Sequence, residues 1–448
     1  MTPGSASPKL LQGPEGRTLR SLMVPMLIGM VAMIVYNLAD IYFVAQLGTA
    51  ELTALSFTIP VVFFVGSITV GFGNGTSAVC ARLYGENRVE DIGRVTMHAV
   101  FLGAATCIAL IIIGLSTIDP LFRLLGASDA TLLIIERYMR IYYFGLLFIV
   151  GPLIANPVLR SSGDARTPAM IMLVSAGVNI ILDPILIFGL LGAPRLGIEG
   201  AAVANVIANF VAMVAAFAAL YYRANIVFPK TPALGQLFES WRSILHVGIP
   251  ATTSAAIAPM TTAFITHQIA GFGQSAVAGY GIASRMESLA LLVMVALGTA
   301  VTPFVGQNFG ARRMDRVANG IRWCQRFFVA YGVAVAVVLA VAAPYIVAAF
   351  TVNETAISAA LLHMRIVPAS YLAVGFALAA TNSLNAIGRP LPAMFISLTR
   401  TILVYAPLAY AFSQVLGLVG IFVAAFTANF IAGALGLILY RRILLQIR

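Results

Sequence analysis

Charged side chains are scarce in this sequence. Asp, Glu, Lys and Arg make up 10% of its 448 residues, whereas 60% of the residues are hydrophobic and the mean hydropathy is +0.96. A soluble fold of this length needs far more charge to cover its surface, and disordered chains are poor in apolar residues. The composition therefore excludes cytosolic enzymes and disordered proteins and predicts an integral membrane protein.

Cysteine is nearly absent. Cys80, Cys107 and Cys324 each lie in or beside apolar sequence, with none of the paired spacing that metal sites and disulfide frameworks need. We interpret them as packing residues. The N-terminal segment 1–18 is polar, and the apolar segment after it runs on without a small-residue cleavage site, which argues against a cleaved signal peptide.

Lysine is also rare, because 25 of the 27 cationic side chains are Arg. These arginines lie mostly between apolar stretches and form no dense basic run. The net charge of +11 therefore does not indicate a nucleic-acid partner, and we interpret the cations as signals of membrane topology.

Long apolar runs are abundant. A bilayer core about 30 Å thick is crossed by a helix of about 20 apolar residues, and twelve segments meet this requirement. The predicted spans cover residues 21–46, 52–81, 95–117, 137–159, 167–191, 199–222, 240–271, 276–307, 319–350, 364–386, 391–413 and 417–440. The predicted fold class is an all-α integral membrane protein with 12 transmembrane helices.

The positive charges orient these spans. A cytoplasmic N-terminus places 20 of the 27 cations on the inner side, so the positive-inside rule predicts that both termini are cytoplasmic. We expect a multi-pass protein of the cell (inner) membrane. Its predicted cytoplasmic segments are an N-terminal tail at 1–20, a linker at 223–239 and a C-terminal tail at 441–448.

The two halves of the chain repeat each other at a constant offset of 225 residues. The offset pairs Pro25 with Pro250 and sets Arg82-Leu-Tyr-Gly85 against Gln307-Asn-Phe-Gly310. Common small residues also align by chance, but several Gly and Pro matches at one offset favour duplication. Six spans per half is an even number, so we predict two pseudo-symmetric six-helix lobes related by an axis along the membrane normal, around a central cleft. The N-lobe is expected at 21–222 and the C-lobe at 240–440.

Two acidic residues lie at membrane depth, where ionisable side chains are costly and usually functional. Asp40 in the first span and Asp183 in the fifth are expected at similar depth, in the outer half of the membrane. Polar residues at i+3 and i+4 spacing accompany them. The three polar faces are Tyr36, Asn37 and Asp40 in span 1, Asn179 and Asp183 in span 5, and Asn205 and Asn209 in span 6.

Two neighbouring carboxylates in an apolar medium disfavour their charged forms, so this pair would hold a proton readily. It would hold Na⁺ equally if amides and carbonyls completed an oxygen shell, and Pro184 frees the carbonyl of Ile180 for that purpose. The alternative is that one Asp caps or bridges helices and the other faces a water-filled vestibule. Neither Asp recurs in the second half, which favours a dedicated ion site.

The remaining intramembrane ionisable residues leave alternatives open. Glu287 is either an interhelical structural residue or a carboxylate for substrate or a second ion. Arg285 lies two positions away and does not share its helix face, so a salt bridge between them is not expected. His267 is interpreted as a satisfied polar residue near an interface, and Arg400 pairs across helices or contacts lipid phosphate.

The motifs together resemble those of the multidrug and toxic compound extrusion (MATE) transporters, from about residue 17 to 440. The resemblance rests on the following segments: Val24-Pro25, Tyr36-Asn-Leu-Ala-Asp40, Gln46-Leu-Gly48, Gly163-Asp-Ala-Arg166-Thr-Pro168, Asn179-Ile-Ile-Leu-Asp183-Pro184, Arg285-Met-Glu287-Ser, Val305-Gly-Gln-Asn-Phe-Gly310-Ala and Asn385-Ala-Ile-Gly388-Arg-Pro. The acidic pair is similar to that of the DinF-like branch. NorM-type members carry acidic residues in spans 7 and 10 that have no counterpart here.

This resemblance implies roles for individual residues. It implies that Asp40 and Asp183 bind the coupling ion together with Tyr36 and Asn179. If that ion is Na⁺, the implied metal ligands are Asp40, Asp183 and Asn179. A polar position in span 6 that is usually Thr is Asn205 here, which puts the ion preference in doubt. Asn156 matches an Asn of the first-lobe cavity. The residues assigned to substrate are Asn37, Asn156, Asn209 and Glu287.

The predicted function is secondary active export of lipophilic organic cations in exchange for H⁺ or Na⁺ by alternating access. We expect no enzymatic activity and no cofactor beyond the coupling ion. Membrane lipid surrounds the protein, which we expect to be a monomer. The alternative is a flippase for a lipid-linked saccharide in a related two-lobed fold, although such flippases tend to have a more cationic cavity and extra spans.

Overall fold

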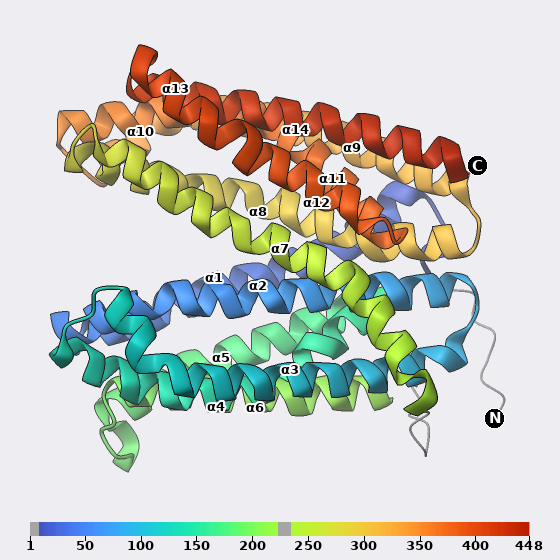
Figure 1. Ribbon diagram of the computed structural model, residues 1–448, viewed down its shortest axis with the longest axis horizontal. Helices are drawn as coiled ribbons and strands as arrows, with labels where there is room; N and C mark the ends of the chain where they lie inside the picture. Colours follow the sequence, from blue (N-terminus) through green and yellow to red (C-terminus); the bar gives the residue numbers. More distant parts are fainter. Residues whose placement is uncertain (1–8, 223–233, 448) are drawn as a thin grey trace.

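The computed structural model describes residues 9–222 and 234–447, and every regular element in these ranges is helical. The helices form two lobes that lie side by side (Figure 1). The N-lobe contains α1 Glu15–Ala45, α2 Thr49–Gly85, α3 Val89–Leu124, α4 Asp129–Ser161, α5 Arg166–Phe188 and α6 Ile198–Tyr222. The C-lobe contains α7 Leu237–Ala270, α8 Gln274–Gly310, α9 Met314–Ala348, α10 Glu354–Ile366, α11 Tyr371–Ala386, α12 Pro390–Leu398, α13 Ala406–Leu416 and α14 Leu418–Ile447.

Two of the C-lobe spans are interrupted helices. The 3₁₀ turn Val367–Ser370 joins α10 to α11 at Pro368, and the π-helical segment Thr399–Tyr405 joins α12 to α13 just before Pro407. A proline lacks the N–H of a regular helical turn, so the neighbouring backbone adopts a tighter or wider turn. Counted as single spans, these two and nine other helices of the described chain are long and apolar enough to cross a membrane. The helix α7 is the twelfth long one, and its apolar stretch is diluted by Thr252, Thr253 and Ser254.

The helices extend beyond the predicted spans, because capping residues set where a helix begins and these lie outside the apolar run. For example, α4 begins at Asp129, after the side chain of Ser128 accepts a hydrogen bond from the Thr131 N–H, rather than near residue 137. Within the predicted N-terminal tail 1–20, residues 1–8 lie outside the described residues, and α1 begins at Glu15. The predicted C-terminal tail is helical to Ile447.

The predicted linker 223–239 lies mostly outside the described residues, which resume at 234, and α7 starts at Leu237. The segment Lys9–Leu11 forms a 3₁₀ turn that is held by the C-lobe. Asn308 donates to the Leu10 carbonyl at 3.2 Å, and Arg313 donates to the Leu11 carbonyl at 2.9 Å. The start of the described chain is therefore fixed against the end of α8.

The first helix of each lobe crosses to the other lobe. Leu19 and Met23 of α1 belong to the hydrophobic core of the C-lobe, whereas Ile244 of α7 belongs to the core of the N-lobe. Leu19 and Ile244 are equivalent positions under the offset that pairs Pro25 with Pro250, so the exchange is reciprocal. Figure 1 shows α7 running diagonally from one lobe to the other. Two lobes joined in this way fit parallel repeats.

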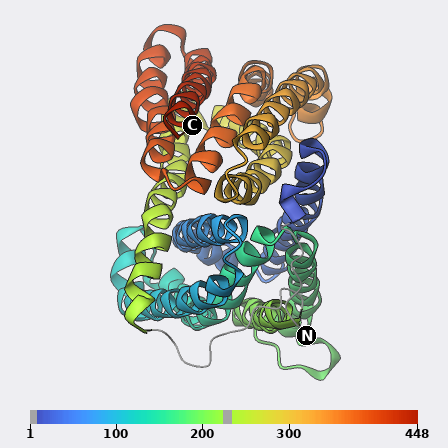
Figure 2. The same ribbon diagram turned by 90° about the vertical axis from the view of Figure 1, so that its right-hand side faces the viewer.

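The start of the described chain and the end of α14 lie at the same end of the molecule, here called the termini side (Figures 1 and 2). The lobes pack tightly there, without room for side chains on certain glycines. A Cβ on Gly85 would overlap the backbone oxygen of Gln307, and one on Gly310 would overlap that of Arg82. These two contacts are equivalent in the repeat, because Gly85 corresponds to Gly310 and Arg82 corresponds to Gln307. Close backbone approach of α2 and α8 therefore closes the termini side.

Candidate functional site

The helix α1 places Tyr36 and Asp40 one turn apart near its end on the side opposite the termini. Asp40 is half-buried, and its carboxylate forms neither a hydrogen bond nor an ion pair within the described ranges. Asn37 was predicted to share this face. It is exposed, and its amide donates to the carbonyl of Met33 at 2.7 Å, since a polar side chain in a helix can bond to the preceding turn. Its contact with substrate stays a prediction.

The helix α5 buries Asn179 and Asp183, which are one turn apart; 0% of Asp183 is exposed. With the Asn179 amide oriented by its neighbours, its nitrogen donates to Asp183 Oδ2 at 2.9 Å and its oxygen accepts from the Asn205 backbone N–H at 3.3 Å. Asp183 Oδ1 has no hydrogen-bond partner in the described structure. A buried carboxylate oxygen without a partner is costly, so it is a natural position for a proton or a cation.

The helix α6 links these residues to α1. Asn205 Nδ2 donates to the Tyr36 hydroxyl at 2.5 Å, and Asn209 Nδ2 donates to Asn205 Oδ1 at 2.8 Å. Because Tyr36 accepts from Asn205, its own hydroxyl hydrogen is free to be donated to a carboxylate. Asn209, predicted for substrate, is thus the end of the polar chain that positions Tyr36.

The two carboxylates lie in one group of polar side chains. Asp40 and Asp183 are within electrostatic range of each other, and both are within range of the hydroxyls of Tyr36 and Tyr138. The structure therefore brings together Tyr36, Asp40, Asn179, Asp183 and Asn205 from α1, α5 and α6, as the spacing of these residues predicts.

Sequence reasoning missed Tyr138 and Tyr142 on α4. Tyr138 is 4% exposed and stacks on Tyr142, with ring centroids 6.4 Å apart and an interplanar angle of 12°. Both rings lie within electrostatic range of Tyr36. The available signal was the i, i+4 spacing of two hydroxyl-bearing rings near the start of span 4. Aromatic residues are common in membrane helices, which hides this signal.

Two of the predicted substrate residues lie away from this cluster. Asn156 follows Tyr138 on α4 by five helical turns, which places it roughly 27 Å along the helix toward the termini side. Glu287 lies on α8 in the C-lobe, where its Oε2 is 3.0 Å from His363 Nε2 on α10. Sequence spacing assigns a residue to a helix, but only the packing of helices decides which cavity it reaches. The structure therefore does not join these two residues to the acidic pair, and their contact with substrate stays a prediction.

Arg400 and Arg285 are the two other charged residues that the sequence placed at membrane depth in the C-lobe. Arg400 in the π-helical segment lies within electrostatic range of Glu287, as does Tyr371. Arg285 is exposed and forms no ion pair in the described ranges, which agrees with the expectation that it does not pair with Glu287. The contact between α8 and α10 supports the interhelical interpretation of Glu287.

The Glu287→Gln variant tests this interpretation. We expect it to keep gradient-driven transport within about twofold of wild type while losing the charged hydrogen bond to His363, for which about 1–3 kcal/mol of stability is typical. Thermal unfolding can be followed with a thiol-reactive dye, because all three cysteines are buried in the folded protein. A large loss of transport without a lower melting temperature would instead indicate a direct role in transport.

The Asn205→Ala variant tests the link between α6 and α1. It removes the hydrogen bonds to Tyr36 and Asn209, each worth about 1 kcal/mol, so the apparent affinity for the coupling ion should fall roughly fivefold or more. The measurement is the dependence of transport rate on the concentration of H⁺ or Na⁺. Ser175→Ala is a suitable control, because it removes one α5–α6 hydrogen bond, to the Ala208 carbonyl, outside the polar chain. An unchanged affinity in Asn205→Ala would show that Tyr36 is positioned without it.

Two parallel six-span repeats, a closed end where they meet and a carboxylate pair inside one lobe define a membrane transporter. The profile of the MatE family matches residues 25–185 and 250–411, once in each half, and the two matches begin at the paired prolines Pro25 and Pro250. The chain belongs to this family. The match confirms the predicted family and its duplication, while the DinF-like branch stays a prediction.

Relatives and solved structures agree with this assignment. The chain is 34% identical over 425 residues to the FAD transporter of Shewanella oneidensis, covering 95% of this chain and 94% of that one. It is 26% identical to the multidrug export protein MepA of Staphylococcus aureus, covering 92% and 90%.

Among solved structures, the Vibrio cholerae MATE transporter VcmN in the bent form superposes with a TM-score of 0.91 at 28% identity, covering 96% and 97% of the two chains. An outward-facing multidrug resistance MATE family transporter gives a TM-score of 0.89 at 26% identity, covering 98% of each chain. These likenesses confirm the prediction of 12 transmembrane helices in two lobes.

Proposed function

We propose that this transporter is a cation-coupled exporter that exchanges lipophilic organic cations for H⁺ or Na⁺ by alternating access. The supporting observation is that Asp40 and Asp183 lie within electrostatic range of each other inside the N-lobe, where Asp183 Oδ1 has no hydrogen-bond partner in the described structure. Two carboxylates in an apolar setting repel each other and favour uptake of a positive charge. Ion binding would therefore be strongly favourable and would change the forces on α1.

The proposed cycle follows from the packing of α1. With the termini side in the cytoplasm, the described state is closed to the cytoplasm, and the ion enters from the opposite side. The half-buried Asp40 receives it first, and Asp183 shares it. Neutralisation changes the position of Tyr36 relative to Asn205, α1 bends at Pro25, and the bound drug is displaced outward. The state open to the cytoplasm then releases the ion.

If the ion is Na⁺, oxygen atoms are available for it. The candidate ligands are the two carboxylates, the Asn179 amide oxygen, the Tyr36 hydroxyl and the Ile180 carbonyl freed by Pro184. Such an oxygen set also serves a proton bound between carboxylates. Transport measured under a pH gradient and under a Na⁺ gradient distinguishes the two ions.

A second candidate cargo is a flavin dinucleotide, which is favoured by the 34% identity to the FAD transporter across 95% of this chain. The coupling site would be the same and only the substrate would differ. The lipid-linked saccharide alternative has no comparable support. It predicts a more cationic cavity, whereas Arg285 is exposed and Arg400 lies within range of Glu287.

The test is transport by the purified full chain in liposomes. A pH gradient and a Na⁺ gradient are imposed separately, and efflux of a fluorescent organic cation or of FAD is measured. Transport of the cation driven by one gradient supports the main proposal and identifies the ion. Transport of FAD alone supports the second cargo, and transport of neither under any gradient contradicts both.

A further inference from the structure

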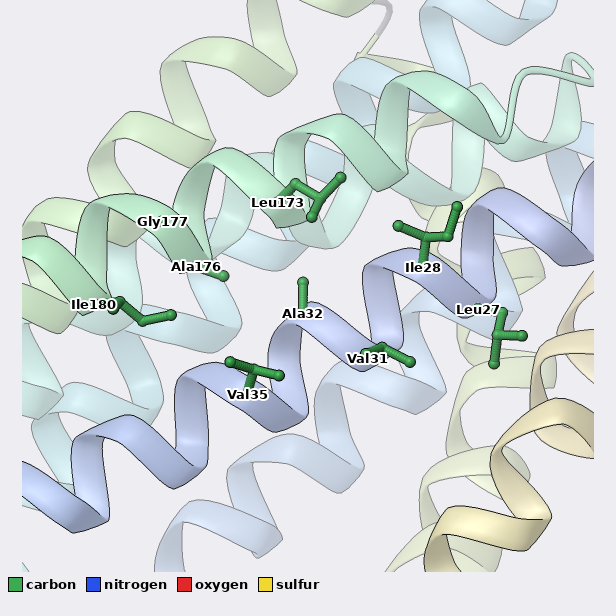
Figure 3. A pocket seen from close by; sticks show the side chains of 9 residues that line it. All are labelled: Leu27, Ile28, Val31, Ala32, Val35, Leu173, Ala176, Gly177 and Ile180. Carbon is green, nitrogen blue, oxygen red and sulfur yellow. The ribbon is translucent and has the colours of Figure 1, made fainter.

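Two adjoining hollows lie along the surface where α1 packs on α5. The first, of about 850 Å³, is lined at the termini side by Arg17, Arg20 and Arg166. The second, of about 510 Å³, continues farther along the same helices (Figure 3). Ile28 and Leu173 line both, so the hollows form one continuous groove, here called the α1–α5 groove.

The far part of the α1–α5 groove is apolar. Figure 3 shows aliphatic side chains from α1 and α5 along it. Its lining residues are Leu27, Ile28, Val31, Ala32, Val35, Leu173, Ala176, Gly177 and Ile180. A Cβ on Gly177 would meet no atom within 4 Å, so this glycine keeps the floor of the groove open. About half of Ile28 and of Val35 is exposed, as suits side chains in contact with an acyl chain.

The near part of the groove is basic. The three arginines are exposed, and none forms an ion pair in the part of the chain that the structure describes. Arg20 donates to the Gly16 carbonyl at 3.3 Å and lies 5.5 Å from the centre of the Trp323 ring. The nearest acidic residue in sequence to Arg166 is Asp164, whose carboxylate caps α5 by accepting from the N–H groups of Arg166 and Thr167. Within the described ranges, the carboxylates nearest in sequence are therefore engaged elsewhere, since Asp164 caps α5 and Glu15 pairs with Arg316, and the three arginines are left without an ion pair.

The groove is long enough to extend from the headgroups through the hydrocarbon of one leaflet of a membrane. Arg20 and Val35 are about four helical turns apart on α1, roughly 22 Å, which exceeds the ~15 Å of hydrocarbon in half a bilayer. A phosphate beside the arginines would thus lie at headgroup level, with an acyl chain lying along the aliphatic part. Basic pockets between transmembrane helices are typical binding sites for anionic lipid headgroups.

We propose that the α1–α5 groove binds an anionic phospholipid of the leaflet on the termini side. Its phosphate contacts Arg17, Arg20 and Arg166, and one acyl chain lies along α1 and α5. A zwitterionic lipid fits the aliphatic part equally, but the cationic group of its headgroup offsets its phosphate, so it compensates the three arginines less than an anionic lipid does. The lipid would contact Pro25 and end beside Val35, next to Tyr36, so it would hold the helix that carries Asp40.

The experiment measures lipid retained by the full-length protein. Nanodiscs of phosphatidylcholine containing increasing phosphatidylglycerol are extracted into mild detergent, and bound lipid is counted by native mass spectrometry. Each arginine contributes about fivefold to anionic-lipid binding, so the preference for phosphatidylglycerol should be on the order of a hundredfold. The variant with Arg17→Gln, Arg20→Gln and Arg166→Gln should lose that preference. Gly177→Leu should fill the groove and lower the retention of both lipids.

A second triple variant changes the net charge of the protein by the same amount and serves as the control. Arg242→Gln, Arg389→Gln and Arg441→Gln remove three exposed arginines that do not line the groove, and this variant should retain the wild-type preference. Equal loss in both triple variants would show a diffuse charge effect and overturn the proposal. The proposal would also be overturned if the wild-type protein showed no preference for phosphatidylglycerol, or if Gly177→Leu retained as much lipid as the wild type.

Discussion

Gradient-driven efflux is expected to fall to the leak of protein-free liposomes when Asp40 or Asp183 is replaced by Asn. The amide has nearly the shape of the carboxylate but takes up neither a proton nor a compensating charge, so the repulsion that makes ion binding favourable is absent. Asp183→Asn should also weaken the contact with Asn179, which donates to Asp183 Oδ2 at 2.9 Å. The measurement is transport of a fluorescent cation under the gradient that drives the wild type.

The control for this prediction is Asp119→Asn. Asp119 is exposed and pairs with Arg123 on the same helix, so its replacement should leave transport unchanged. Protein yield and the melting temperature establish that each variant is folded. Wild-type transport by folded Asp40→Asn and Asp183→Asn would remove the acidic pair from the mechanism.

Replacing Gly85 or Gly310 by Ala is expected to prevent closure of the termini side. The added Cβ would overlap a backbone oxygen of the other lobe, which cannot rotate away as a side chain does. The lobes must therefore separate there, and transport should be strongly reduced because one of the two alternating states is lost. Spin labels on Glu90→Cys and Arg312→Cys should report a longer distance by pulsed electron resonance. Both positions are exposed, and the native cysteines are buried.

Two glycines of the same helices provide matched controls. Gly66 in α2 and Gly281 in α8 have no atom within 4 Å of an added Cβ, so their Ala variants should keep the wild-type distance and transport. These controls separate interlobe overlap from the general effect of Gly→Ala on helix stability. An unchanged distance in Gly85→Ala would show that the contact between α2 and α8 is not needed for closure.

The spacing of polar residues predicted much of the candidate site. Tyr36 and Asp40 are one turn apart, as are Asn179 and Asp183, and helical periodicity alone places each pair on one face. The same reasoning did not show that the Asn37 amide bonds within its own helix, or that Asn156 lies far along α4 from the acidic pair. Periodicity gives a direction around a helix but does not say which neighbour lies in that direction.

The sequence by itself determined the membrane environment, the twelve spans and the duplication, because bilayer thickness and helix geometry act on each segment independently of the others. Tertiary structure alone decided that Tyr138 joins the acidic pair, that Glu287 pairs with His363, and that α1 and α7 exchange between lobes. These features depend on which helices lie side by side. The packing of backbones at positions such as Gly85 and Gly310 sets that arrangement, and the hydropathy of single segments does not encode it.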